Sequence, residues 1–475
     1  HGGGDIPAQE QAAGRPVVDV KAAAGQSGCT AQTVGAAGAL KKGFVTGHGT
    51  RQGEFGKEGV VPLAQAEHQR QFSDGRHAQR AGVGSAVQHG GTVLDGRKLD
   101  YLVVNHMEPD HAASLEEVLI RYPECKVISN EKAFMFMRQF GFDVDGREDT
   151  VKEGDTRCFG KHTVTFLMAQ MVHWPEAMVT FDTTNGVLFS ADAFGSFGSL
   201  DGRLFDDEVN FDRDWIDNAR RYFTNIVGKY GPFVQQLLAK AKTAPIKMFC
   251  PLHGPVWRTN LGYYLDKHDK WSRYIPEENG VMIVYASMYG NTESAAQALA
   301  AQLCEKGVTN VRVYDVSKTH VSYLVAEAFK YSHIVLASVT YNLNIYPVME
   351  DFLHHLKVLN LSKRVFGIIE NGSWAIKSGS LMEQYIDENL KDCKILNARM
   401  TINSSANRSN ASELDALSDA IVKSVAIEEK AFEQRVIDDA AFAEEEARKA
   451  AFKKLSAKER MALMREKHRQ EKGEA

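Results

Sequence analysis

The chain has 475 residues, a formal net charge of -5 at neutral pH and 44% hydrophobic residues. This length is sufficient for two or three domains, each with a buried core. The near balance of charge excludes the strong basic field typical of nucleic-acid binding, and it also excludes a highly acidic solvating chain. Apolar runs stay shorter than the roughly 18 residues of a membrane helix, and no secretory signal is visible at the N-terminus. We therefore expect a cytoplasmic protein that binds neither nucleic acid nor membrane.

The six cysteines are spread along the chain, and none of them forms a CxxC pair. Such sparse cysteines in a chain of this size predict reduced thiols and not a disulfide framework. We also infer that the chain has no CxxC-based iron–sulfur or rubredoxin-type centre of its own.

Residues 1–92 differ sharply in composition from the rest of the chain. They contain 19 of the 39 glycines, but only one isoleucine and two leucines. No hydrophobic periodicity emerges, and the segment is too poor in apolar residues to offset the entropy cost of ordering it. We interpret it as an aberrant Gly/Gln-rich segment, either translated in a shifted frame or present as a genuine disordered extension.

An α/β layered domain is predicted for residues 93–276, where strand-like apolar runs alternate with helical patterns. The predicted helices include Ala112–Arg121 and Asp212–Gly228. The predicted strands are Tyr101–Asn105, Lys126–Ser129, Thr163–Met168, Met178–Asp182, Val187–Ala191 and Ile246–Cys250.

A turn-like linker is predicted at Glu277–Gly280, followed by a second α/β domain over residues 280–426. Helical segments separate its strands, which favours a doubly wound parallel sheet. The predicted strands are Val281–Ala286, Val311–Asp315, His333–Ala337, Val365–Glu370 and Lys394–Met400. Residues 427–475 are half charged and predict a solvated helical tail with i, i+4 ion pairs.

A dense group of metal-ligating residues follows the first predicted strand, where His106, Glu108, Asp110 and His111 fall within six positions. A loop between a strand and a helix can turn several side chains into one cavity. Two metal ions would need further ligands, including a bridging carboxylate. His173, Asp192 and His253 each follow an apolar run, although singly such residues are more often caps or turn formers.

The string from His106 to His111, with His173 in HWP and His253 in PLHGP, resembles the metallo-β-lactamase fold and, within it, the flavodiiron (A-type flavoprotein) family. Hydrolases of this fold have HxHxDH, whereas this chain has Glu108 in place of the second histidine. An anionic oxygen ligand favours iron or manganese over a hydrolytic zinc pair. The resemblance implies an αββα sandwich in which His106, Glu108 and His173 hold one iron, Asp110, His111 and His253 hold the other, and Asp192 bridges them.

A candidate phosphate cradle lies between the first strand and first helix of the second domain. Hydroxyl and amide side chains and a glycine at a helix N-terminus can bind an anion through backbone N–H groups and the helix dipole. The spacing lacks the lysine of a Walker motif, which favours a tightly held mononucleotide. The cradle comprises Ser287, Met288, Tyr289, Gly290, Asn291 and Thr292.

Two later loops follow the third and fourth strands, at the edge of the sheet where ligands bind in doubly wound folds. Tyr341 and Trp374 could stack on a flat ring there. With the cradle, these loops resemble flavodoxin and imply bound FMN. The candidate ring-binding residues are Ser338, Thr340, Tyr341, Asn342, Asn371, Gly372, Ser373 and Trp374.

Together the two domains have the arrangement of the flavodiiron family. The resemblance implies an oxidoreductase that relays electrons through FMN to two irons and reduces dioxygen to water, nitric oxide to nitrous oxide, or both. It also implies an external donor such as rubredoxin or a flavin reductase, and a head-to-tail homodimer or tetramer. The alternatives are a flavodoxin-type electron carrier with a defective metal domain, and a metallohydrolase–flavodoxin fusion.

Overall fold

The computed structural model of the protein describes residues 60–62, 94 and 96–430. No helix in these ranges is long and apolar enough to cross a membrane. The chain divides into two compact units. The first runs to Gln170 and includes Trp174–Trp215 and Ala244–Leu261, and the second comprises Met171–His173, Ile216–Thr243 and everything from Gly262 onward.

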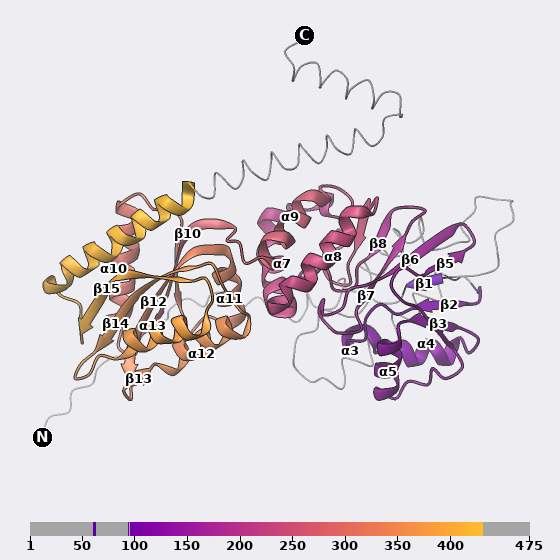
Figure 1. Ribbon diagram of the computed structural model, residues 1–475, viewed down its shortest axis with the longest axis horizontal. Helices are drawn as coiled ribbons and strands as arrows, with labels where there is room; N and C mark the ends of the chain where they lie inside the picture. The colour runs from indigo at the N-terminus through magenta and orange to yellow at the C-terminus, as the bar shows by residue number, and fades with distance from the viewer. Residues whose placement is uncertain (1–59, 63–93, 95, 431–475) are drawn as a thin grey trace, which may run out of the picture. The chain divides into compact units, whose positions relative to one another are not determined.

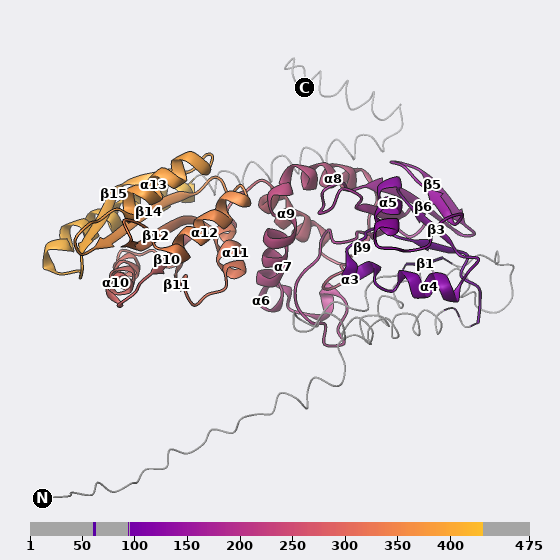
Figure 2. The same ribbon diagram turned by 90° about the horizontal axis from the view of Figure 1, so that it is seen from below.

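The first unit contains two β-sheets (Figures 1 and 2). One is entirely parallel, in the order β1 (Val60–Pro62), β2 (Tyr101–Val103), β3 (Lys126–Ser129) and β4 (Glu148–Thr150). The other has the order β5 (Thr156–Phe159), β6 (His162–Met168), β7 (Met178–Asp182), β8 (Val187–Phe189) and β9 (Met248–Cys250). Its strands pair antiparallel except for β8 and β9, which are parallel.

Alternating side chains of the parallel sheet join two different cores. Val103 and Ile128 pack in one cluster with Phe166 and Phe189 of the second sheet. Leu102 and Val127 are buried in the other cluster, together with residues of three helices. This alternation is the period-2 pattern of a sheet buried on both faces. The helices are α3 (Pro109–Ala112), α4 (Leu115–Arg121) and α5 (Glu131–Gln139).

The second unit contains a parallel sheet in the order β11 (Val311–Asp315), β10 (Glu278–Ala286), β12 (Tyr331–Tyr341), β14 (Val365–Gly372) and β15 (Lys394–Asn403). A short strand, β13 (Asn344–Ile345), pairs antiparallel with the end of β12. In chain order the sheet reads 2-1-3-4-5, the strand order of flavodoxin-like folds. The topology confirms the predicted fold class of an α/β domain followed by a flavodoxin-like doubly wound parallel sheet.

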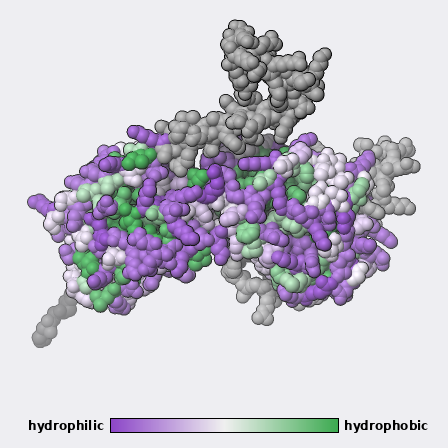
Figure 3. All heavy atoms as spheres, in the orientation of Figure 1, coloured by the Kyte–Doolittle hydropathy of each residue, from purple (hydrophilic) through white to green (hydrophobic). Residues whose placement is uncertain are grey.

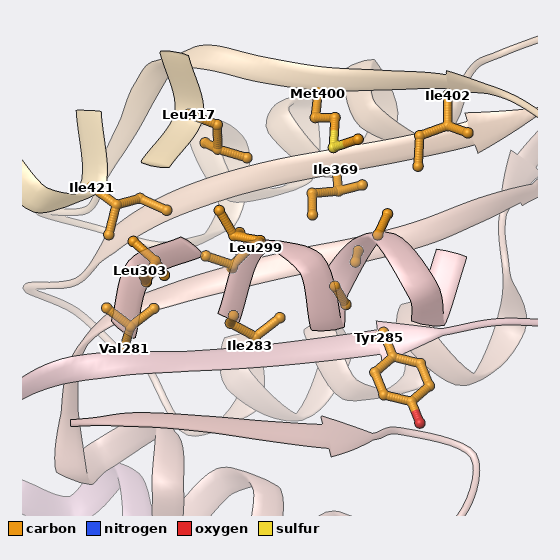
Figure 4. Close-up of a cluster of buried hydrophobic side chains, with 14 of the residues drawn as sticks. Val281, Ile283, Tyr285, Leu299, Leu303, Ile369, Met400, Ile402, Leu417 and Ile421 are labelled. Atoms are coloured by element: carbon orange, nitrogen blue, oxygen red, sulfur yellow. The ribbon is translucent and has the colours of Figure 1, made fainter. Parts of the chain in front are cut away.

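Helices cover both faces of this sheet (Figure 1). On one face lie α11 (Val321–Lys330), α12 (Pro347–Val358) and α13 (Ser378–Asn389). On the other lie α10 (Asn291–Glu305) and a helix over residues 411–430. Figure 4 shows Leu299 and Leu303 of α10, and Leu417 and Ile421 of the last helix, packed against strand residues such as Ile369. The visible surface of both units is mostly hydrophilic (Figure 3).

Three further helices, α7 (Ile216–Tyr222), α8 (Gly231–Thr243) and α9 (Leu261–Ser272), fall almost entirely in the second unit. A buried ion network fastens two of them to the start of β10. Glu277 accepts hydrogen bonds from Arg220 of α7 and from Lys267 and Trp271 of α9. The other short helices in the described part of the chain are α6 (Phe211–Asp214), a π-helix (Phe223–Val227) and three 3₁₀ helices (Asp206–Glu208, Gly228–Tyr230 and Arg408–Asn410).

Three sequence predictions are wrong in detail, and one of them is the predicted helix Ala112–Arg121, which is interrupted at residues 113–114 between α3 and α4. The predicted linker Glu277–Gly280 is mostly strand, because β10 begins at Glu278. Asn279 donates to Val425 O and accepts from Ser332, so tertiary hydrogen bonds draw polar residues into the sheet. The predicted helix Asp212–Gly228 is divided into α6, α7 and the π-helix Phe223–Val227.

The two ends of the chain lie largely outside the described residues. Within the segment 1–92, the structure describes one strand, β1, which pairs with β2 at the edge of the sheet. Among the described residues β1 is the edge strand of this sheet, a position that tolerates Pro62. The last helix continues to residue 430, beyond the predicted domain end at 426. The predicted domain boundaries stay predictions, as do the nature of residues 1–92 and of the charged tail.

Candidate metal centre and flavin site

Seven side chains with metal-ligating atoms gather into two groups. The ligand atoms within each group all lie within 4.8 Å of one another. The first group comprises His106, Glu108, His173 and Asp192, and the second comprises Asp110, His111 and His253. His173 lies on the short stretch Met171–His173 that is counted with the second unit, although the chain before and after this stretch belongs to the first. The structure thus brings together every metal ligand predicted from the sequence.

Asp192 faces both groups with different oxygen atoms. Its Oδ2 lies 3.4 Å from Nε2 of His106 in the first group. Its Oδ1 lies 2.9 Å from Nε2 of His111 and 3.4 Å from Nε2 of His253 in the second. A carboxylate placed in this way can bridge two cations.

The first four ligands lie where β2 ends and α3 begins. β2 stops at Val103, and Asn105 then fastens the loop to β7: its carbonyl accepts from Met178 N at 3.0 Å and its side chain from Thr180 Oγ1 at 2.7 Å. Pro109 starts α3 because proline suits the first helical position. Asp110 and His111 therefore lie in the first turn of α3, directly after the proline that starts the helix.

Asp192 and His253 are adjacent because their strands are parallel neighbours. Phe189 of β8 pairs with Cys250 of β9, so both strands end at the same edge. Ala191 then adopts a left-handed φ of 50°, and its carbonyl accepts from Leu252 N at 2.9 Å. A β-carbon at Gly254 would lie 2.9 Å from the β-carbon of Ser196, so only glycine fits beside His253. Strained backbone of this kind is typical of functional sites.

The site is partly buried and rich in negative charge: His106, Asp192 and His253 are buried and the other four ligands are half-buried. Burial disfavours the charged form of His106, yet its pKa is raised well above the usual value. The cause is hydrogen bonding to three carboxylates, which belong to Asp192, Glu108 and Glu176. Such an anionic cavity is complementary to cations. Its donor set of four imidazoles and three carboxylates suits iron or manganese, so the residues present fit a paired metal site.

One functional residue escaped the sequence analysis. Glu176 is 1% exposed, and its Oε1 lies 2.8 Å from Nδ1 of His106. The available signal was a carboxylate three positions after His173 in the same loop. Glutamate is common in loops, however, and only the tertiary structure brings this one to His106.

The predicted phosphate cradle joins β10 to α10. Gly290 has a left-handed φ of 85° and donates its N–H to Ser287 Oγ at 3.1 Å. Gly290 is the N-cap of α10, a helix of 15 residues. Because glycine has no side chain, the N-cap residue does not cap the backbone N–H groups of the first turn. Those groups and the helix dipole suit a phosphate. Met288 and Tyr289 are 41% and 86% exposed at the tip of the loop.

Strand register places the two other predicted loops beside the cradle. Ala286 pairs with Ser338, and Val339 pairs with Asn371, so three adjacent parallel strands end at one edge. A hydrogen bond joins Asn371 Nδ2 to Thr292 Oγ1 at 3.1 Å. The candidate flavin residues thus share one edge of the sheet.

Two of the exposed aromatic side chains lie at this edge, Tyr341 at the end of β12 and Trp374 just after β14. Trp374 is 81% exposed and Tyr341 is 39% exposed. Asn342 and Leu343 turn the chain with left-handed φ values of 49° and 62° between β12 and β13. Ser373 accepts a hydrogen bond from Ser404 at 3.0 Å. Two flat rings on neighbouring loops are compatible with stacking on a flavin.

Other predicted flavin residues have structural partners. Ser338 is fully buried, and its hydroxyl donates to Val339 O at 3.2 Å. The hydroxyl of Thr340 accepts from Lys377 N and Ser378 N, at 2.9 and 3.1 Å, at the start of α13. A β-carbon at Gly372 would lie 2.3 Å from Ala375 O, so glycine is required there. These residues shape the loops, whatever they also contact.

Comparisons with known proteins agree with both halves. Residues 84–254 match the family model of the ODP family beta lactamase, and residues 283–394 match that of flavodoxin. The chain is 29% identical to a nitric oxide reductase of Moorella thermoacetica over 64% of its own length and 74% of the relative. It is also 29% identical to a rubredoxin-oxygen oxidoreductase of Megalodesulfovibrio gigas, over 62% of its own length and 73% of the relative.

A third relative is matched over less of its length. The chain spans 65% of an uncharacterised protein of Methanocaldococcus jannaschii, with 32% identity over 55% of its own length. Among solved structures, the flavodiiron protein of Giardia intestinalis superposes with a TM-score of 0.68 at 21% identity. That alignment covers 78% of this chain and 86% of the other.

The two family models together cover more than half of the chain, in the order metal domain and then flavodoxin domain. The curated relatives align across this arrangement, and the solved structure shares the fold. The chain therefore belongs to the flavodiiron protein family.

Proposed function

We propose that the protein is a flavin- and iron-dependent oxidoreductase that reduces dioxygen to water, nitric oxide to nitrous oxide, or both. The observation that carries this proposal is the position of Asp192, whose two oxygens face two separate groups of ligands. The names of two relatives, a nitric oxide reductase and a rubredoxin-oxygen oxidoreductase, supply the two candidate substrates.

We assign the seven candidate ligands to two irons according to the group in which each side chain lies. His106, Glu108 and His173 would hold one iron, and Asp110, His111 and His253 the other. Asp192 would bridge the pair. The iron pair, when bound, supplies the site at which the gas is bound and reduced. The carboxylates contribute negative charge, which stabilises iron in its higher oxidation state.

The edge of the second sheet would hold FMN. The N–H groups around Gly290 and the hydroxyl of Ser287 would bind its phosphate, while Tyr341 and Trp374 would flank its ring. Bound flavin supplies one-electron transfer. The loops fix its position, because Thr340 and Gly372 hold them in their observed form.

Two partners are part of the proposal. The electron donor is external, either rubredoxin or a flavin reductase, in line with the name of one relative. The protein assembles as a homodimer or tetramer, in which the flavin of one subunit serves the irons of another. Light scattering of the purified protein tests the assembly, and reduction by rubredoxin followed at flavin wavelengths tests the donor.

The first experiment is a determination of metal and flavin in protein purified without oxygen. We expect two irons and one FMN per chain, and consumption of dioxygen or nitric oxide when a reductant is supplied. Zinc in place of iron would support a metallohydrolase fusion instead. Flavin without metal would support a simple electron carrier.

A matched pair of variants ties the result to the site. Asp192→Asn removes the charge of the residue between the two ligand groups, whereas Asp201→Asn changes an exposed carboxylate that pairs with Arg203. Only the first should lower the iron content and the gas consumption. Equal behaviour of the two variants would contradict the assignment of Asp192.

A further inference from the structure

Glu176 makes close contacts beside the candidate metal site. Its side chain is fully buried, and Oε1 lies 2.8 Å from His106 Nδ1. The same oxygen accepts the backbone N–H of Met107 at 3.0 Å. Two adjacent groups of the ligand loop therefore point at one carboxylate oxygen.

These contacts select one form of the His106 ring. Oε1 is an acceptor for Met107, and it accepts a second hydrogen bond when Nδ1 carries the ring proton. Nε2 then has a lone pair, and it lies 3.4 Å from Oε2 of Glu108 and 3.4 Å from Oδ2 of Asp192. The ring thus presents its ligating nitrogen to the atoms that complete the first group.

Glu176 is itself held in place from another element. Its carbonyl accepts from Asn130 Nδ2 at 2.6 Å, and Asn130 Oδ1 accepts from Ala133 N at 3.1 Å as the N-cap of α5. The Trp174 ring also makes an edge-to-face contact with the ring of His106, with centroids 5.4 Å apart. The imidazole therefore contacts both a carboxylate fixed by α5 and an aromatic ring.

The second oxygen of Glu176 has a different environment. Oε2 is buried and has no hydrogen-bond partner among the described residues. A buried negative charge is costly unless positive charge lies near it. A metal ion bound by His106 would supply that charge through the ring.

We propose that Glu176 is a positioning residue for the metal site: it fixes the tautomer and orientation of His106 and adds negative charge behind it. This inference rests on the proposed function, because it requires a metal at the first ligand group. Carboxylates behind histidine ligands orient the ring and raise its basicity, and losing one typically lowers metal affinity roughly 10–100-fold.

The test compares Glu176→Gln, Glu176→Asp and the control Glu116→Gln, which changes an exposed carboxylate on α4. Purified holoprotein is exposed to a chelator, and metal release is followed for whichever metal the wild type retains. The midpoint potential of the metal site and the melting temperature of the metal-free protein are measured in parallel.

We expect Glu176→Gln to release about one metal equivalent roughly 10–100-fold faster than the wild type. Its potential should rise, because a negative charge has been removed. Glu176→Asp keeps the negative charge, so its rate of metal release and its potential should lie between those of the wild type and Glu176→Gln. Glu116→Gln should have the same release rate and potential as the wild type. FMN content should stay equal in all variants.

Two results would overturn the proposal. One is metal release and a potential in Glu176→Gln that equal those of the wild type. The other is a lower melting temperature of the metal-free protein without any change in potential, which would show a purely structural role. A wild type that retains no metal would instead overturn the proposed function, and the inference with it.

Discussion

The two candidate sites of this protein are assembled in different ways. The flavin loops follow three adjacent parallel strands, β10, β12 and β14, whose register brings the loops together. The metal ligands come from the ends of β2, β8 and β9 and from the loop before β7, in two different sheets. One site follows from the topology of a single sheet, whereas the other needs two sheets to be packed correctly.

This difference has a physical consequence. A substitution in the flavin edge should act locally, because neighbouring strands hold the loops by backbone hydrogen bonds. The metal site depends on side chains converging from distant parts of the sequence, so one ligand affects all the others. The variants below test whether the two sites can be disrupted separately.

The largest effect is expected for the buried ion network that joins α7, α9 and β10. Glu277→Gln should lower the free energy of unfolding of the second unit by up to about 3–5 kcal/mol, since it removes the buried carboxylate that pairs with Arg220 and leaves that side chain only Asp217 and Glu327. Urea unfolding followed by flavin fluorescence measures this change. Asp266→Asn, which removes an exposed partner of Lys270, should change the same quantity by less than about 1 kcal/mol.

Asp192→Ala should abolish the paired metal site while leaving the flavin in place. We expect metal affinity to fall by more than the roughly 100-fold that loss of an outer partner costs, because both ligand groups lose an oxygen. Metal analysis and FMN absorbance of the same sample provide the measurement. Loss of FMN together with the metal would show that the two sites are not independent.

Gly372→Ala is the converse test, because it should disrupt the flavin site and leave the metal site intact. The added carbon would lie 2.3 Å from Ala375 O, so the loop must move. We expect FMN affinity to fall about tenfold, or about 1.4 kcal/mol, with unchanged metal content. Fluorescence titration of the flavin-free protein measures the affinity. The control is Gly262→Ala, where the added carbon meets nothing within 4 Å.

The smallest effect concerns the pH dependence of the second unit. Burial lowers the pKa of His333 to about 4, below its usual value. Below about pH 6.5 the imidazole of His333 is therefore protonated in the unfolded chain but stays neutral in the folded protein. The free energy of unfolding consequently falls as the pH drops from about 6.5 towards 4. Between pH 6.5 and 5.5 we expect a loss of about 1 kcal/mol from this residue.

His333→Gln should flatten this part of the stability curve, as measured by urea unfolding at several pH values. Glu277 titrates elsewhere, because its folded pKa is lowered to about 2 by Arg220 and Lys267 in spite of burial. Its contribution is lost only as the pH falls from about 4.5 towards 2. An unchanged slope between pH 6.5 and 5.5 in His333→Gln would argue against the role given to His333.

Much of the architecture was predictable from the sequence. The strands Lys126–Ser129, Met178–Asp182 and Val311–Asp315 have the predicted bounds, because short runs rich in apolar and β-branched residues mark strands. The linker at Glu277–Gly280 was predicted wrongly, because a run of polar residues and glycine is typical of turns. The Gly280 backbone lies close to Asn310, where a side chain would clash, and such tertiary packing leaves no trace in local composition.

For the sites, the sequence by itself predicted the side chains that we propose as metal ligands and the position of the candidate phosphate cradle. Both are marked by residue type at the end of an apolar run. Only the tertiary structure decided that Asp192 faces both ligand groups, that Glu176 contacts His106, and that the hydroxyl of Thr340 caps α13. The reason is that ligand identity is a local property of the chain. Distances between residues as far apart as 106 and 176 or 192 and 253, in contrast, are set by how strands pair and sheets pack.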